Sequence, residues 1–156
     1  MRSPLRGDWD GLIRKLQNLP KRMQEELRKA VQEAAFTVEA VAVGHLKNQD
    51  LGWEPLTERY LRWKKRRGYS EKTLIRTATY FRAIAVEEQA DGLGAFVGVK
   101  RGVARERNGQ DIVDIAAFHE EGTDRIPARP LWQPTYEETR HEVADRITRA
   151  ALEALR

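Results

Sequence analysis

The chain has 156 residues, of which 28 are basic and 24 acidic, so its formal net charge at pH 7 is +4. This length fits one domain with a substantial core, and the modest positive excess permits contact with nucleic acid without requiring it. It contains no cysteine, which excludes disulfides and thiolate metal sites and fits synthesis in a reducing cytoplasm. No apolar run is long enough to cross a bilayer, and the first eight residues hold no apolar stretch, so we expect neither a membrane span nor a signal peptide.

The N-terminal third of the chain predicts helices. Apolar residues at helical spacing over 8–18 predict a short helix or arm within residues 1–19. Pro20 suits the first position of a helix, and apolar residues then recur every three to four positions as far as Asn48, which predicts one long amphipathic helix. One stretch of it is rich in small residues that would let another backbone come close: Ala30, Ala34, Ala35, Ala40, Ala42 and Gly44.

The next segment predicts shorter elements. A loop over 51–57 leads into a basic helical turn from about Thr57 to Arg67, which Gly68 ends. Residues 74–84 predict a short helix that passes into strands.

Two turn signals organise the centre of the chain. The segments 85–89 and 95–99 read as strands and flank a glycine-rich turn, which predicts a hairpin. Asn108-Gly109 is a strong signal for a second turn, which follows a predicted strand over 103–107.

The C-terminal part predicts two helices. Apolar residues at helical spacing from Ile112 predict a short helix that Gly122 ends, with a strand as the alternative. Pro134 predicts the start of an amphipathic helix that runs to about Leu155. The elements together predict an α+β fold in a single domain over 1–156, with a long N-terminal helix, a small mostly antiparallel sheet and a C-terminal helix.

No pattern of catalytic residues stands out. His119-Glu120 lacks the second histidine four positions away that a zinc motif needs, and a helix-end histidine that makes a hydrogen bond is the simpler interpretation. Glu120 and Glu121 are adjacent and point apart on a helix, which disfavours an acid/base pair. The sequence contains neither a glycine-rich phosphate loop nor a nucleophile elbow. We therefore expect no enzymatic activity, no metal and no cofactor.

A basic cluster with interleaved aromatic residues extends from Arg59 to Arg67. Cations and rings together suit a phosphate backbone or exposed bases, which gives the hypothesis of a nucleic-acid-binding module. On a helix, Tyr60 and Trp63 can instead be partly buried while the charges face solvent or an acidic protein surface. The near balance of charge over the chain favours this second interpretation. The candidate contact residues are Arg62, Lys64, Lys65, Arg66 and Arg67.

The most distinctive segment is residues 116–131, in which a polar turn precedes Ile-Pro-Ala-Arg-Pro-Leu. Pro127 and Pro130 fix their own φ angles and push the residues before them into extended geometry, so the segment is stiff and non-helical. An arginine held in this way, Arg129, loses little freedom when it pairs with a carboxylate. We expect it to anchor this segment to the nearby Glu120 or Glu121, or to a neighbouring subunit.

This segment resembles the A-x-x-H-E-x-G-T … I-P-A-R-P-F/L element of tailed-phage neck proteins, the tail-completion, minor head–tail joining and virion-morphogenesis families. Residues 53–57, 74–84 and 96–99 are similar, in the same order, to three further stretches of these families. Ala78 stands where the families usually have glycine, from which we expect that the backbone needs no positive φ there. The residues that carry the resemblance and are its candidate interface or structural residues are Trp53, Pro55, Leu56, Thr77, His119, Glu120, Gly122, Thr123, Pro127, Arg129 and Pro130.

The resemblance implies a structural virion protein of the head–tail junction, made in the host cytoplasm and without catalytic activity. It implies a homo-oligomeric ring, most simply a hexamer, that completes the tail and joins it to the head. The implied partners are the head connector or stopper protein and the tail terminator or tail tube protein, with genomic DNA passing through the ring and no membrane contact. The small-residue stretch of the long helix is the expected contact between subunits, and nucleic-acid binding through Arg59–Arg67 is the alternative function.

Overall fold

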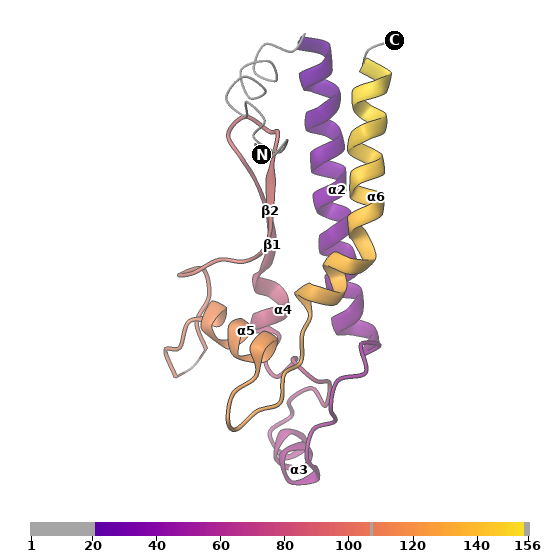
Figure 1. The fold of residues 1–156 in the computed structure, drawn as a ribbon. Helices are drawn as coiled ribbons and strands as arrows, with labels where there is room; N and C mark the ends of the chain where they lie inside the picture. Colours follow the sequence, from indigo (N-terminus) through magenta and orange to yellow (C-terminus); the bar gives the residue numbers. More distant parts are fainter. Residues whose placement is uncertain (1–20, 107, 155–156) are drawn as a thin grey trace, which may run out of the picture.

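The computed structural model describes residues 21–106 and 108–154 (Figure 1). The short helix predicted over 8–18, and Pro20, lie outside this range. A long first helix, a two-stranded antiparallel sheet and a long C-terminal helix confirm the predicted α+β class. The described elements, in chain order, are α2 (Lys21–Asn48), α3 (Glu58–Arg66), α4 (Thr79–Ala83), β1 (Ile84–Glu88), β2 (Ala95–Val99), α5 (Ile112–Glu121) and α6 (Trp132–Ala154).

The helix α2 packs against α6 and also against the β1–β2 hairpin, as Figure 1 shows. Its small side chains Ala30, Ala34, Ala35 and Ala42 are buried, which lets the neighbouring elements come close. The small-residue stretch that suggested a contact between subunits is therefore largely covered within the chain. We name α2, α6 and the hairpin together the helical body.

Polar contacts reinforce the helical body at its surface. Arg146 of α6 pairs with Glu33 of α2 at 2.8 Å and with Glu142 at 2.9 Å. On the other side of α2, the Arg28 Nε donates to the Asp91 carbonyl in the hairpin turn at 2.7 Å. These contacts tie α2 to both of its neighbours.

The hairpin follows the predicted alternation. The pairs Ile84↔Val99 and Val86↔Val97 contribute buried or half-buried side chains, whereas the pair Glu87↔Phe96 is exposed. Since side chains alternate between the faces of a strand, one face of the hairpin packs against α2 and the other is open. The hairpin prediction is thereby confirmed.

The core lies where the end of α2, the short helix α4, the strands and α5 meet, next to the start of α6. It combines aliphatic and aromatic side chains from segments far apart in the sequence. Its buried members are Leu46, Tyr80, Ala83, Ile84, Val99, Ile112, Ala116 and Leu131.

Two local predictions are wrong and one open alternative is settled. The predicted strand over 103–107 is absent from the described part of the chain, where only an isolated bridge joins Arg105 and Asp111. Asp111 instead caps the N-terminus of α5, because its carboxylate accepts from the backbone N–H of Val113 at 3.1 Å. The segment after it is a helix and not a strand. The second incorrect prediction is the start of the last helix, which lies at Trp132, two residues before the predicted Pro134.

No helix within residues 21–106 and 108–154 combines the length and apolar character needed to cross a membrane.

Candidate functional site

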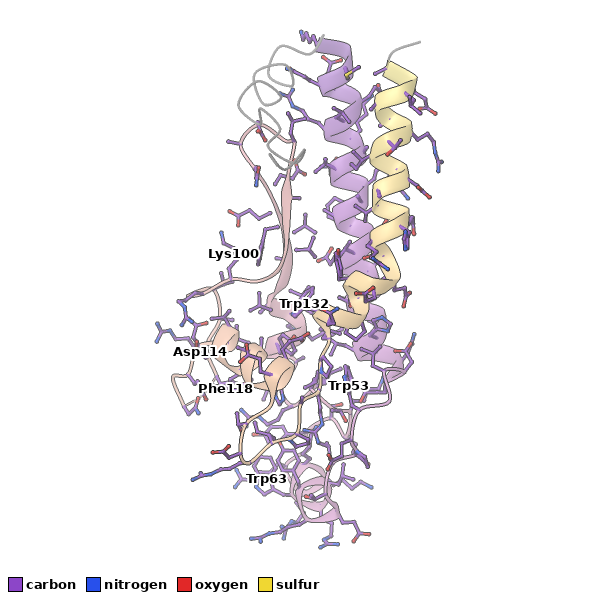
Figure 2. All side chains as sticks on the ribbon, in the orientation of Figure 1. Trp53, Trp63, Lys100, Asp114, Phe118 and Trp132 are labelled. Carbon is purple, nitrogen blue, oxygen red and sulfur yellow. The ribbon has the colours of Figure 1, made fainter. Side chains whose placement is uncertain are left out.

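Residues that carry the family resemblance meet at one place, although they come from two distant stretches of the chain. The Trp53 indole Nε1 donates to the Pro130 carbonyl at 2.8 Å, and the Arg129 Nε donates to the Glu54 carbonyl at 3.1 Å. Figure 2 labels Trp53 and Trp132 in this part of the molecule. We name residues 53–57 and 119–133, joined in this way, the clamp.

Glu120 holds the second half of the clamp together. Its Oε2 accepts from the backbone N–H of Leu131 at 2.8 Å, and its Oε1 accepts from those of Trp132 and Gln133 at 3.0 Å each. These N–H groups belong to the residue before α6 and to its first two residues, and they have no partner inside the helix. The negative carboxylate also suits the positive end of the helix dipole. Pro134 follows and has no N–H that would need an acceptor.

Arg129 forms no ion pair with Glu120 or Glu121 in the described part of the chain, since Glu120 is engaged by the start of α6 and Glu121 is exposed, so that part of the prediction is wrong. The alternative, a pairing with a neighbouring subunit, stays a prediction. Arg129 is only 5 % exposed. Its backbone N–H donates to the His119 carbonyl at 2.6 Å within the second half of the clamp, and its side chain bridges the two halves through the Glu54 carbonyl.

The turn between His119 and Arg129 needs a glycine. Gly122 ends α5 with φ 77°, a region that side chains disfavour. A Cβ at this position would approach the Ala128 backbone nitrogen to 2.8 Å. Beyond it, the Thr123 N–H donates to the Ile126 carbonyl at 2.8 Å, which closes the turn.

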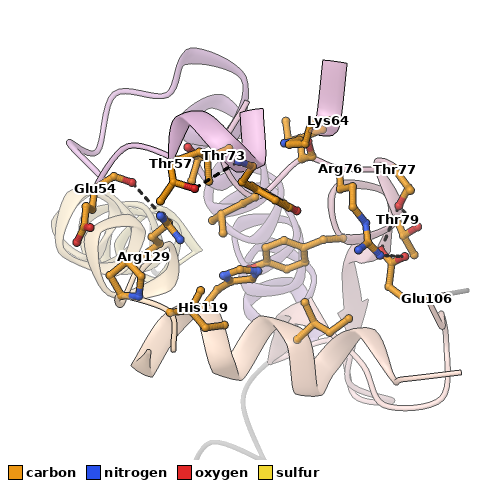
Figure 3. A pocket seen from close by; sticks show the side chains of 18 of the residues that line it. Glu54, Thr57, Lys64, Thr73, Arg76, Thr77, Thr79, Glu106, His119 and Arg129 are labelled. Atoms are coloured by element: carbon orange, nitrogen blue, oxygen red, sulfur yellow. Dashed lines mark hydrogen bonds and ion pairs between the residues drawn. The ribbon is translucent and has the colours of Figure 1, made fainter. Parts of the chain in front are cut away.

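A cavity of about 430 Å³ lies beside the clamp (Figure 3). Its walls come from the clamp, from α3, from the segment 73–79 and from α5. Most of the lining is apolar, including Pro55, Leu56, Leu74, Ile75, Ile115, Ile126 and Pro127. A concave, mostly apolar cavity with a few polar groups is the usual form of a binding site.

Lys64 forms part of this wall, which contradicts the prediction that it faces solvent or acidic protein surface. Its side chain is buried, and its Nζ donates to the carbonyls of Lys72 at 2.7 Å and Ile75 at 3.0 Å. Burial, together with the nearby charge of Arg76, lowers the pKa of Lys64 to about 8. The residue fastens the segment 72–75 to α3.

The segment 73–79 carries backbone strain next to the cavity. Leu74 and Ala78 both adopt positive φ, 61° and 62°, a region that costs a residue with a side chain roughly 1–2 kcal/mol. The prediction that position 78 needs no positive φ is therefore wrong. Strained residues persist where surrounding contacts hold them, and here Arg76 Nη2 pairs with Glu106 at 2.6 Å while Thr77 donates to the same carboxylate at 3.1 Å.

Glu106 and Arg76 are site residues that sequence reasoning did not select. Glu106 lies in a segment without a recognisable motif, Arg76 is not one of the residues that carry the resemblance of 74–84, and their pairing joins positions 30 residues apart. The one available signal was Thr77, a candidate residue of the stretch 74–84, whose hydroxyl donates to Glu106 at 3.1 Å.

His119 lies at the other side of the cavity. Burial and the charge of Arg129 lower the pKa of its imidazole. Its Nδ1 is buried and finds no hydrogen-bond partner among the described residues. The hydrogen bond expected of the His119 side chain is thus absent among the described residues, and one buried polar atom of the ring is unsatisfied.

The basic cluster on α3 is only partly available to a partner. The Tyr60 and Trp63 rings stack with centroids 5.4 Å apart, and Arg67 lies over the Trp63 ring at 5.6 Å. Trp63, labelled in Figure 2, is half-buried as expected, whereas Tyr60 is 38 % exposed. Two further cations have acidic partners, Arg62 with Glu58 at 3.3 Å and Lys65 with Glu71 at 3.1 Å.

The described residues contain no group of three or more histidine, cysteine or acidic side chains that could hold a metal ion. No family model matches the chain, and comparisons with curated proteins and with solved structures find no match either. The geometry of the clamp and of the cavity therefore carries the functional argument.

Proposed function

We propose that this chain is a structural subunit of a tailed-phage neck, where it completes the tail and joins it to the head connector. The observation that carries the proposal is the clamp. Trp53 contacts Pro130, Arg129 contacts Glu54, and Glu120 caps the helix that follows. Stretches that resemble the neck families separately along the sequence thus form one connected set of contacts, as expected if they maintain a single functional loop.

The surface supports a role in an assembly. Large apolar side chains are exposed on four different elements: Phe36 on α2, Phe96 on β2, Phe118 on α5, and Tyr136 and Leu152 on α6. Aromatic residues are enriched at the centres of protein interfaces. Exposed rings on several sides suit a subunit with neighbours on more than one side, as in a ring.

The ring, most simply of six subunits, remains part of the proposal, with heterologous contacts that close by rotation. The small side chains of α2 are largely buried inside the chain, so this stretch of the helix no longer supports the contact between subunits of the ring. The exposed apolar groups are the better candidates for the contacts between subunits and with the stopper and the tail terminator or tube.

Nucleic-acid binding through Arg59–Arg67 has less support. Lys64 points inward, Arg62 and Lys65 have acidic partners, and Tyr60 and Trp63 stack on each other. A dedicated binder would lose affinity steeply with salt, because each neutralised phosphate releases counterions. We expect only weak DNA binding by the purified chain.

The test of the proposal is a nonsense mutation in the gene within the phage that encodes it. We expect DNA-filled heads and completed tails to accumulate separately, and added purified protein to restore joined, infectious particles. Electron microscopy should show a ring at the head–tail junction of the restored particles. Joined and infectious particles in the absence of the protein would contradict the proposal.

The double charge reversal Lys65→Glu with Arg66→Glu separates the two functions. A protein contact through this surface predicts defective joining. Normal joining with altered retention or ejection of DNA would instead favour a contact with the genome.

A further inference from the structure

Two buried cations line the cavity, and neither has an acidic partner within the described part of the chain. Lys64 is 2 % exposed and Arg129 is 5 % exposed. The other two cations of the wall differ, because Arg76 pairs with Glu106 at 2.6 Å and Arg125 is exposed to solvent. A buried charge without a partner is costly, so each of the two calls for an explanation.

The buried charge of Lys64 is stabilised by acceptors within the chain. Its ammonium donates to the carbonyls of Lys72 and Ile75, and an amine with a lowered pKa can also lose its proton at moderate cost. Its role is accounted for by the wall that it holds together.

The buried charge of Arg129 is not satisfied in the same way. A guanidinium remains charged in proteins and carries five N–H donors. Its Nε donates to the Glu54 carbonyl, but its two terminal nitrogens have no acceptor among the described residues. Figure 3 shows the guanidinium at the edge of the cavity, near His119. The planar pair of terminal nitrogens is the arrangement that binds a carboxylate with two parallel hydrogen bonds.

The neighbouring His119 supplies a second unsatisfied polar atom. Its Nδ1 is buried and unpartnered in the described structure, and the Arg129 charge acts on this ring. Arg125 also lines the cavity but is exposed to solvent. Arg129 is therefore the buried charge that a ligand would satisfy at this end, and a carboxylate matches its planar pair of terminal nitrogens.

The rest of the cavity suits an apolar group. Leu56, Ile115 and Ile126 contribute to its wall. The strained residues Leu74 and Ala78 lie in the segment 73–79, which forms another part of the wall. A wall whose strain is held by several contacts is already organised in the absence of a ligand, which lowers the ordering cost of binding.

We infer that this cavity binds a carboxylate carried on an apolar body, with the carboxylate on the Arg129 terminal nitrogens beside the His119 ring, and the apolar body against Leu56, Ile115 and Ile126. Such a group is supplied either by a small organic acid or by an acidic residue next to an aromatic residue in a partner's peptide segment. The inference does not depend on the neck assignment.

The first test compares two probes on the unmodified protein, 3-phenylpropionate and its neutral counterpart 3-phenylpropanamide. NMR titration should show saturable shifts of the His119 ring signals, assigned with the variant His119→Gln. A charge-assisted pair of hydrogen bonds should make the acid bind about tenfold or more tightly than the amide. Equal affinities, or no saturable binding of the acid, would overturn the inference. The two affinities are both measured on the unmodified protein, and the variant serves only to assign the signals.

The second test replaces the charge. Arg129→Met keeps an unbranched side chain and removes the guanidinium, and should abolish the preference for the acid while the far-UV circular dichroism spectrum is retained. Arg149→Met, at an exposed position on α6, is the matched control and should bind as the unmodified chain does. A folded Arg129→Met protein that still prefers the acid would contradict the assignment of the carboxylate to Arg129.

A third arm distinguishes the two sources with the blocked dipeptide acetyl-Phe-Glu-amide. If the dipeptide binds at least as tightly as 3-phenylpropionate, the carboxylate belongs to a protein partner; if it binds more weakly, a free acid is the natural ligand. Saturable binding of neither probe rejects both sources.

Discussion

The helical body and the clamp are held together by different physics. In the helical body, a row of alanines on α2 is buried, and many small contacts act together over the length of α2 and α6. In the clamp, single side chains bind backbone groups of distant segments, as Trp53, Glu120 and Arg129 do. The clamp should therefore be sensitive to single substitutions, because the loss of one side chain can separate its two halves. In the helical body, the stability is spread over many small contacts.

The largest effect should come from the charge that caps α6. Glu120→Ala leaves the N–H groups of Leu131, Trp132 and Gln133 without their acceptor. Hydrogen bonds to charged groups contribute about 1.5–3 kcal/mol, so we expect the free energy of unfolding to fall by about 3 kcal/mol in chemical denaturation. Glu121→Ala is the control, since Glu121 is exposed, and should change it by less than about 0.5 kcal/mol. Similar losses for both variants would mean that the cap is not the source of the stability.

A somewhat smaller loss should follow from overpacking the helical body. Ala42 is 0 % exposed, and Ala42→Leu adds carbon atoms where there is no room. We expect the free energy of unfolding to fall by about 2 kcal/mol. Ala40→Leu, on the same helix at an exposed position, should be nearly neutral. A neutral Ala42→Leu would show that α2 and its neighbours can move apart, contrary to the close packing described.

The strained residue Ala78, in the segment 73–79 next to the cavity, allows a stabilising change. Glycine adopts positive φ without the penalty that Ala78 bears, although it loses more backbone entropy on folding. We expect Ala78→Gly to raise the free energy of unfolding by about 0.5–1 kcal/mol. Ala85→Gly, in the regular strand β1, should lower it by a similar amount. Two changes of the same sign would indicate that Ala78 is not strained.

The contrast between the two regions also explains what the sequence could predict. Helical periodicity and turn residues specified α2, the hairpin, α5 and α6 to within a few residues, because those elements follow local patterns. The stiff segment around Pro127 and Pro130 was recognisable for the same reason, since proline acts on its own backbone and on the residue before it.

The contacts of the clamp were not predictable in this way. Glu54 acts through its backbone carbonyl, which carries no sequence signal at all. Glu120 and Glu121 look alike in the sequence, yet one caps α6 and the other is exposed, and only the path of the chain decides between them. Lys64 looked like one cation in a basic run, and only the fold of the segment 72–75 beneath α3 reveals its burial.

A further prediction is a dependence of stability on pH that originates at Lys64. Burial, together with the charge of Arg76 and against the weaker opposite influence of Glu71, lowers the pKa of this residue from 10.5 to about 8. Between these values the unfolded chain binds more protons than the folded one, so the contribution of Lys64 to the free energy of unfolding rises as the pH increases from about 8 toward 10.5. Lys64→Met removes this contribution, and chemical denaturation at about pH 7 and about pH 9.5 should therefore show the difference between the unmodified chain and the variant growing with pH. Lys65→Met, at an exposed position paired with Glu71, should follow the unmodified chain at both values. If the free energy of unfolding of Lys64→Met changes with pH in the same way as that of the unmodified chain, the ammonium is better solvated than its position between α3 and the segment 72–75 implies.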